Sequence, residues 1–263
     1  MCVANQKGGV GKTTTVANLG GLLAEQGQRV LMLDLDPHGS LSAYFGLDPD
    51  LTAASVADLF NLNGKVPPHP RLVTPTEVDN LHLLPAAAQQ ATLDRELASK
   101  GGMGLVLTEV LKSWRRQFDH VLLDCPPTLG VLMINALAAC DRVLIPVQTD
   151  YLALQGLKRM TNTLGMVGAS LGYDIAHTII PTFFDTRTRA SRAALQDLRN
   201  EFSANLWPGA IPIDTKFRDA SRQGLPLNLF APNSRGTLAY RNLFSALQDD
   251  ATTHHAGSLR EAV

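Results

Sequence analysis

Residues 7–15 read KGGVGKTTT, and this stretch constrains the fold more than any other part of the chain. Glycine has no Cβ atom, so a backbone with three glycines in four residues can curl tightly and turn consecutive N–H groups inward. Apolar residues precede the curl and a helical pattern follows it, and a curl that feeds a helix N-terminus binds polyphosphate. An ordinary glycine-rich turn is the weaker alternative, because Gly11, Lys12 and Thr13 stand in register after an apolar strand.

The residues of this predicted phosphate-binding loop have separate tasks. Lys12 supplies a positive charge for the outer phosphates, and the hydroxyl of Thr13 is a ligand for Mg²⁺. Gln6 stands where the usual pattern has its first glycine, and a second lysine, Lys7, opens the loop. We therefore expect the nucleotide to contact Lys7, Gly8, Gly9, Val10, Gly11, Lys12, Thr13 and Thr14.

Continuous apolar runs predict an α/β fold, a mostly parallel twisted sheet with helices on both faces. Runs at 1–4, 29–36, 119–124, 141–148 and 174–181 are typical of strands buried on both faces, and shorter strands are expected at 81–84 and 210–212. Helical patterns lie between them, at 13–26, 88–97, 105–118, 149–166, 189–202 and 234–247. We expect a single domain over residues 1–248 and a polar, flexible tail at 249–263.

Composition excludes several classes of protein. The net charge of −1 and the charged content of 18% do not predict a binder of polyanions from bulk charge, so any contact with nucleic acid needs a local patch. Cys2, Cys125 and Cys140 lack metal-ligand spacing, which fits a reducing cytosol. The loop follows residue 1 too closely for a signal peptide, and no apolar run has membrane-spanning length.

Acidic residues end two of the predicted strands. Asp34 and Asp36 close the run at 29–36, and Asp124 closes the run at 119–124. Because open α/β sheets bind ligands at the carboxyl ends of their strands, these acids are expected beside the phosphate loop. An aspartate that follows an apolar strand in this way reaches Mg²⁺, usually through a water molecule.

Four segments resemble one family. Residues 4–15, ANQKGGVGKTTT, are similar to the deviant Walker A loop of the ParA/MinD family of P-loop ATPases, whose mark is the early lysine, here Lys7. DPHGS at 36–40 resembles the family's DPQGN segment, with departures at His38 and Ser40. DCPP at 124–127 and PVQ at 146–148 resemble its D-x-P-P and P-x-Q segments. The resemblance continues to about Leu247 and so covers nearly the whole chain.

The resemblance implies a slow, partner-stimulated ATPase that uses ATP and Mg²⁺ and forms a homodimer in its ATP state. In the family the early lysine reaches the partner's nucleotide, so Lys7 would act in trans, as an arginine finger does. The resemblance implies that Lys7, Lys12 and Asp36 are catalytic and that Thr13, Asp36 and Asp124 surround the metal. A turn cap before Pro37 is the alternative role for Asp36. On the purine side the resemblance points to Thr182 and Pro212.

Members of this family differ in the surface that they bind. Lys216, Arg218 and Arg222 lie within seven residues, and with Arg189 and Arg192 they predict contacts to DNA phosphates that do not depend on base sequence. A solvated helix face is the alternative. The tail lacks the basic amphipathic helix of MinD-like members, so no membrane contact is expected.

The cargo implied by the resemblance is a plasmid, a chromosome locus or a protein cluster, brought by an activating adaptor protein. The DPHGS segment and the proline-rich middle of the chain resemble the ParA-like members that position chemotaxis arrays. We expect a cytoplasmic bacterial protein at the nucleoid, at a cell pole or at such a cluster.

Two other functions compete with this one. A redox or cluster-carrying P-loop protein, similar to the nitrogenase iron protein or the Mrp-type scaffolds, also has the early lysine but needs exposed cysteines near the dimer seam. An inactive ATPase retained as a binding module is disfavoured, because Lys7, Lys12, Thr13, Asp36 and Asp124 are all present.

Overall fold

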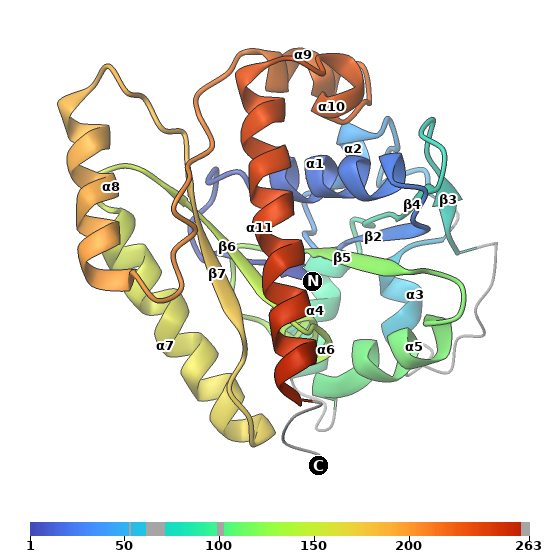
Figure 1. The fold of residues 1–263 in the computed structure, drawn as a ribbon. Helices are drawn as coiled ribbons and strands as arrows, with labels where there is room; N and C mark the ends of the chain where they lie inside the picture. Colours follow the sequence, from blue (N-terminus) through green and yellow to red (C-terminus); the bar gives the residue numbers. More distant parts are fainter. Residues whose placement is uncertain (53, 62–71, 99–102, 259–263) are drawn as a thin grey trace.

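The sheet has seven strands in the order β3-β4-β2-β5-β1-β6-β7 (Figure 1). The computed structural model describes residues 1–52, 54–61, 72–98 and 103–258. The strands are β1 (Cys2–Val3), β2 (Val30–Asp34), β3 (Thr74–Pro75), β4 (Leu81–Leu84), β5 (His120–Asp124), β6 (Val143–Gln148) and β7 (His177–Thr182). Within this sheet only the pairing of β3 with β4 is antiparallel. The predicted fold class is confirmed.

Helices cover both faces, as the apolar runs require. One face carries α1 (Lys12–Glu25) and α11 (Arg235–Ser258) (Figure 1). The short helices α2 (Ser40–Tyr44) and α10 (Leu227–Phe230) contact α1, and α9 (Lys216–Arg222) contacts α10. The other face carries α3 (Val56–Asn61), α4 (Gln90–Ala98), η1 (Met103–Leu105), α5 (Val106–Trp114), α6 (Val131–Ala139) and α7 (Ala153–Leu171). Helix α8 (Arg189–Phe202) packs against α7. Each face therefore has its own hydrophobic core.

Strand β1 is short but central. Cys2 is paired with Leu123 of β5 and with Val143 of β6, and both β1 residues are fully buried. In the same register, Val3 is opposite Asp124, and Asp34 of β2 is opposite Asp124 on the other side. The carboxyl ends of β1, β2 and β5 therefore meet at one edge, where the chain leaves β1 for the glycine-rich loop.

Two predicted boundaries are wrong. Residues 210–212 do not form a ladder, because Pro212 has no N–H to donate, and it makes only an isolated bridge with Phe184. The last helix does not end near Leu247, since α11 continues to Ser258. Residues 248–256 contain neither glycine nor proline, so nothing in the sequence stops the helix there. Pro67, Pro68 and Pro70 of the proline-rich middle lie outside the described residues.

Within the described part of the chain, no helix combines the length and the apolarity needed to cross a bilayer.

Candidate nucleotide-binding site

The glycine-rich loop is anchored at its head by two amide side chains. Asn5 donates from Nδ2 to the carbonyl of Pro146 at 2.8 Å, and its Oδ1 accepts from the backbone N–H of Lys7 at 2.9 Å. Gln6 donates to the Thr163 hydroxyl on α7 at 2.8 Å. The residue that replaces the usual glycine therefore ties the loop to the neighbouring helix.

The rest of the loop uses the conformations that only glycine adopts without strain. Gly9 has a φ of 70° and Gly11 a φ of 95°, and Gly11 directly precedes α1. Lys12 is buried, and its Nζ atom lies 3.5 Å from the carbonyl oxygen of Lys7. The lysine ammonium and the N-terminal N–H groups of α1 thus converge on the loop, which is the arrangement expected of a polyphosphate site.

The metal side of the site joins the loop to β5. The Thr13 hydroxyl donates to Oδ2 of Asp124 at 2.7 Å. Asp124 is buried, and its other oxygen, Oδ1, has no partner among the described residues. A buried carboxylate oxygen without a partner, beside a hydroxyl, offers the hard oxygen ligands that Mg²⁺ prefers, so the residues fit this ion.

The described side chains alone do not complete a metal site. In the described residues no three His, Cys, Asp or Glu side chains form a group that could hold an ion. This agrees with the usual binding of Mg²⁺ by one or two carboxylates together with water and substrate phosphates.

Asp34, which is opposite Asp124 in the sheet, holds the segment after β2 by hydrogen bonds. It accepts hydrogen bonds from the backbone N–H and the hydroxyl of Ser42, both at 2.8 Å, and from the N–H of Asp36 at 3.2 Å. Burial raises the pKa of Asp34 to about 6. Burial and the nearby charge of Asp34 raise the pKa of Asp124 well above its usual range. The site thus holds like charges close together out of water, which an added cation would relieve.

Asp36 holds the turn that follows β2. Its Oδ1 atom accepts from the backbone N–H of His38 at 3.0 Å and lies 2.9 Å from Nδ1 of the same residue. The Asp36 side chain is mostly covered, whereas that of His38 is 80% exposed. Asp36 therefore caps this turn, as the alternative role requires. Its proposed roles in orienting the attacking water and in holding Mg²⁺ stay predictions.

Lys7 is held by its own chain. Its Nζ atom lies 2.5 Å from Oδ2 of Asp150, just beyond the end of β6, and each side chain is about one-third exposed. Oδ1 of Asp150 also accepts from the N–H of Leu152 in the turn that leads into α7. The second lysine of the loop therefore points toward β6 rather than toward Lys12.

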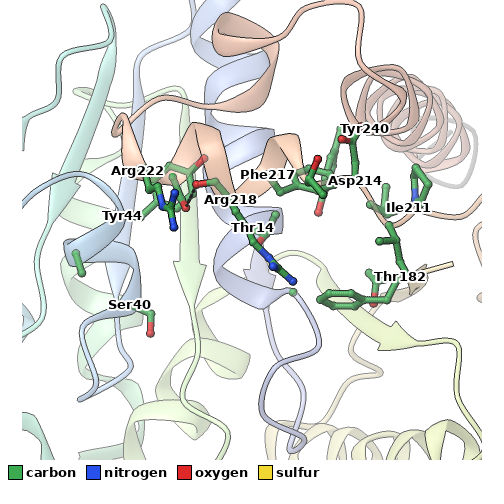
Figure 2. Close-up of a pocket in the computed structure, with 17 residues that line it drawn as sticks. Thr14, Ser40, Tyr44, Thr182, Ile211, Asp214, Phe217, Arg218, Arg222 and Tyr240 are labelled. Carbon is green, nitrogen blue, oxygen red and sulfur yellow. Dashed lines mark hydrogen bonds between the residues drawn. The ribbon is translucent and has the colours of Figure 1, made fainter. Parts of the chain in front are cut away.

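A cavity of about 640 Å³ opens beside the loop, beyond Thr14 (Figure 2). Its walls come from α1, α2, α9, α11, the carboxyl end of β7 and the segment 211–215. They include Gly11, Thr14, Ser40, Tyr44, Thr182, Phe183, Ile211, Pro212, Asp214, Phe217, Arg218, Arg222 and Tyr240. Both residues predicted for the purine side, Thr182 and Pro212, line this cavity.

Two wall residues have roles that sequence reasoning did not resolve. Thr182 is buried and donates from its hydroxyl to the carbonyl of Val10 at 2.9 Å, so it holds the loop against β7. Phe183 was not predicted as a site residue. It has a φ of 52°, which is unusual for a bulky residue, and its ring lies 3.7 Å from the position of a Cβ atom added to Gly11. No sequence signal identifies such a conformation.

The structure separates the five cations predicted for DNA. Arg189 and Arg192 are exposed on α8, and the other three are on α9, which lies well apart from α8 (Figure 1). Lys216 is within 3.3 Å of Asp219. Arg218 and Arg222 line the cavity instead.

The cysteines lie in the core. The sulfur atoms of Cys2 and Cys125 are 3.2 Å apart and both residues are fully buried, while Cys140 is half-buried. Burial raises the pKa of the Cys2 thiol well above its usual value. The exposed cysteines required by a cluster carrier are therefore missing from these three positions, and packing explains Cys125.

Known proteins share this fold and sequence. The profile of a family described as AAA domain matches residues 1–176. The chain is 35% identical over 244 residues to the sporulation initiation inhibitor protein Soj of Bacillus subtilis (strain 168), a match that covers 92% of this chain and 95% of Soj. It is 34% identical over 241 residues to the chromosome partitioning protein ParA of Myxococcus xanthus (strain DK1622), covering 91% and 84% of the two chains.

A solved structure agrees with these relatives. The crystal structure of cobyrinic acid a,c-diamide synthase from Mycobacterium smegmatis, with bound ADP and magnesium, matches with a TM-score of 0.81 and 35% identity, covering 96% of this chain and 95% of the other. Identity at this level over nearly the whole length leaves no room for a chance likeness. The chain belongs to the ParA/MinD family of P-loop ATPases.

Proposed function

We propose that this protein is an ATP-dependent switch that dimerises around two nucleotides and positions or segregates a cargo. The observation that carries the proposal is the contact between Thr13 and Asp124, the two proposed metal ligands, directly beside the glycine-rich loop. The Bacillus and Myxococcus relatives, one of them a chromosome partitioning protein, support the biological setting. The ADP and the magnesium bound in the Mycobacterium structure support a nucleotide and Mg²⁺ as the ligands of this site, and no other property of that protein is used.

The chemistry follows from charge. The loop N–H groups and Lys12 bind the outer phosphates of ATP, while Thr13, Asp36 and Asp124 hold Mg²⁺, which neutralises charge that develops on the transferred phosphoryl group. Asp36 orients the attacking water. In this proposal residues 1–248 are the ATPase domain.

Hydrolysis requires the dimer because Lys7 acts on the partner's nucleotide. In the single chain Lys7 is engaged with Asp150, so it must leave this contact before it crosses the interface. A residue supplied in trans ties turnover to assembly. Turnover is therefore slow until an adaptor protein that carries the cargo stimulates it.

The ATP dimer binds DNA without sequence preference. The contacts come from the predicted cations that do not line the cavity, Arg189, Arg192 and Lys216. These side chains contact phosphates, and phosphate contacts carry no sequence information. Doubling of the contacts in the dimer gives the ATP state its higher DNA affinity. The protein acts in the bacterial cytoplasm, on the nucleoid or at a pole, and its cargo is a DNA locus or a chemotaxis protein cluster.

The test is the oligomeric state of Asp36→Ala. Removing the carboxylate abolishes water positioning but leaves the phosphate loop, so the variant should bind ATP and accumulate as a dimer. Light scattering coupled to gel filtration, with ATP and Mg²⁺, measures this directly. Asp50→Ala, which removes an exposed acid from a loop after α2, is the control and should behave as the unmodified chain. A monomeric Asp36→Ala protein with normal hydrolysis would contradict the proposal.

A further inference from the structure

Two arginines of α9 face the nucleotide cavity rather than solvent alone. Arg218 and Arg222 are separated by about one helical turn, so they lie on the same side of α9, and both line the cavity. Lys216 is rotated away from them and lies within 3.3 Å of Asp219. In the described part of the chain, neither arginine makes a salt bridge or a side-chain hydrogen bond. Both residues are exposed, so two unpaired guanidinium groups are available at the wall of one cavity.

The two arginines reach different parts of this cavity. Figure 2 shows the side chain of Arg218 descending from α9 and ending between Thr14 and Thr182. Thr14 belongs to the first turn of α1, directly after the glycine-rich loop. Figure 2 shows Arg222 at the other end of the cavity, beside Tyr44 of α2. Arg218 is thus the cation that overhangs the start of α1.

No carboxylate of the wall neutralises this pair. The acidic wall residue, Asp214, accepts from the backbone N–H of Lys216 at 3.0 Å and from that of Gly236 at 3.1 Å. Its oxygens therefore fix the start of α9 and of α11 and do not pair with the arginines. A cavity with two unpaired guanidinium groups attracts an anion, and the planar guanidinium matches a phosphate through two parallel hydrogen bonds.

The position of Arg218 selects which phosphate it meets. Lys12 lies at the head of the loop, next to the Lys7 carbonyl, where the outer phosphates are expected. The proposed purine side, Thr182 and Pro212, lines the same cavity as Gly11 and Thr14, where the loop passes into α1. Arg218 ends between them, over the first turn of α1. The phosphate that joins the ribose must pass through this point.

We propose that Arg218 is a nucleotide ligand that binds the α-phosphate from the side opposite Lys12. The inference rests on the proposed ATP site and adds a residue to it. Because ATP and ADP share this phosphate, the contact strengthens the binding of both and does not discriminate between them. Arg222 adds to the positive potential without direct contact. The assignment removes both arginines from the predicted DNA patch.

The test is the affinity of Arg218→Ala for ATP and for ADP, measured by calorimetric titration with Mg²⁺ and without DNA. Loss of a charge-assisted contact predicts affinities about tenfold lower for both nucleotides, by a similar factor. Arg218→Lys, which keeps the charge, should recover part of the loss. Arg222→Ala should weaken binding by less than Arg218→Ala. Arg199→Ala, which removes an exposed arginine of α8 outside the cavity, is the matched control and should leave both affinities unchanged.

Several results would overturn the assignment. Unchanged affinities in Arg218→Ala would do so, and so would a loss confined to ATP, which would indicate the γ-phosphate. An equal loss in Arg199→Ala would indicate a diffuse effect of charge. DNA affinity is then compared at saturating ATP, where a loss in Arg218→Ala with intact nucleotide affinity would return Arg218 to the DNA surface. If the unmodified chain bound neither nucleotide, the proposed function itself would fail, which is a distinct outcome.

Discussion

Nζ of Lys7 and Oδ2 of Asp150 are 2.5 Å apart within one chain, across the gap between the glycine-rich loop and the end of β6. The lysine proposed to act on a partner is therefore occupied in the single chain. Both side chains are partly exposed, and ion pairs of this kind contribute about 0.2–1 kcal/mol. This free energy is small enough for the contact to break when the dimer forms, and large enough to change the dissociation constant of the dimer measurably.

Weakening this contact should favour the dimer. Asp150→Asn removes the charge but keeps an oxygen for the N–H of Leu152, so the turn before α7 is preserved. Two such contacts break per dimer, one in each protomer, so we expect the dimer of the Asp36→Ala protein with ATP and Mg²⁺ to become tighter by up to about 30-fold when this change is added. Sedimentation equilibrium gives the dissociation constant. Asp141→Asn, which removes an exposed acid at the opposite end of β6, is the control. A dimer that is weaker in Asp150→Asn would show that the contact between Lys7 and Asp150 does not oppose dimerisation.

Removal of the Lys12 ammonium should abolish useful ATP affinity. Lys12 is the buried cation of the loop, and Lys12→Ala leaves the outer phosphates without it. We expect affinity to fall by at least about 100-fold, since charge-assisted contacts to phosphate are among the strongest hydrogen bonds. Equilibrium titration with a fluorescent ATP analogue measures the change. Lys112→Ala, on the exposed side of α5, should bind as the unmodified chain does, and unaltered affinity in Lys12→Ala would invalidate the phosphate-loop assignment.

The buried acids predict how the stability of the free protein depends on pH. An unfolded aspartate titrates near 3.9, whereas the pKa of Asp34 in the folded chain is raised to about 6. Between these values the folded state keeps a proton that the unfolded state has released. The free energy of unfolding should therefore fall as the pH rises from about 4 to about 6, by roughly 3 kcal/mol for this group. Above that range its contribution is constant.

Asp124→Asn tests this balance. The amide keeps an oxygen for the Thr13 hydroxyl and removes one of the buried charges, so it should stabilise the nucleotide-free protein at pH 8 by about 1–3 kcal/mol. At pH 5 the gain should be smaller, because the raised pKa of Asp124 makes the folded chain take up a proton on this carboxyl more readily as the pH falls. Urea unfolding at the two pH values measures both. An exposed acid changed in the same way, Asp79→Asn, sets the baseline, and a gain independent of pH would speak against buried charge as the cause.

DNA binding should respond to salt in proportion to the number of phosphates that the protein neutralises. Each cation removed from the DNA surface should make the slope of log affinity against log salt shallower by about one unit. The variant is Arg189→Ala with Lys216→Ala, in the Asp36→Ala protein with ATP and Mg²⁺. Fluorescence anisotropy with two duplexes of unrelated sequence, each titrated at several salt concentrations, measures both the salt slope and the dependence of affinity on base sequence. Lys112→Ala is the matched removal of a surface cation. A slope that does not change in the double variant would show that Arg189 and Lys216 are only solvated.

Much of the fold follows from local patterns. The strands β2, β5, β6 and β7 are apolar runs that pack on both faces, and such runs have few other stable placements. The positions of the glycine-rich loop and of the acids Asp34 and Asp124 can be predicted from these strands, because the carboxyl ends of parallel strands meet at one edge of the sheet. Thr13 and Asp124 are 111 residues apart in sequence, yet the topology alone predicts their meeting.

The cavity wall could not be predicted in the same way. Lys216, Arg218 and Arg222 are close in sequence, but on a helix Lys216 and Arg218 differ by about 200° in direction, whereas Arg218 and Arg222 differ by about 40°. Which side faces the nucleotide depends on how α9 docks, and Asp214 contributes to this docking by accepting from the N–H of Lys216 at the start of α9 and from the N–H of Gly236 in α11. Closeness along the chain was therefore a poor guide to a shared surface.

The central place of β1 has a consequence for biosynthesis. The ribosome makes β1 and its loop before the other strands of this sheet, but the neighbours of β1 are β5 and β6, which emerge more than a hundred residues later. Until Val143 and Leu144 have left the exit tunnel, β1 lacks its ladder on the side of β6. Long-range pairings of this kind form late, since the intervening chain must close first. The strand that leads into the glycine-rich loop therefore gains both of its neighbours only after β6 has been made, although β1 itself is made much earlier.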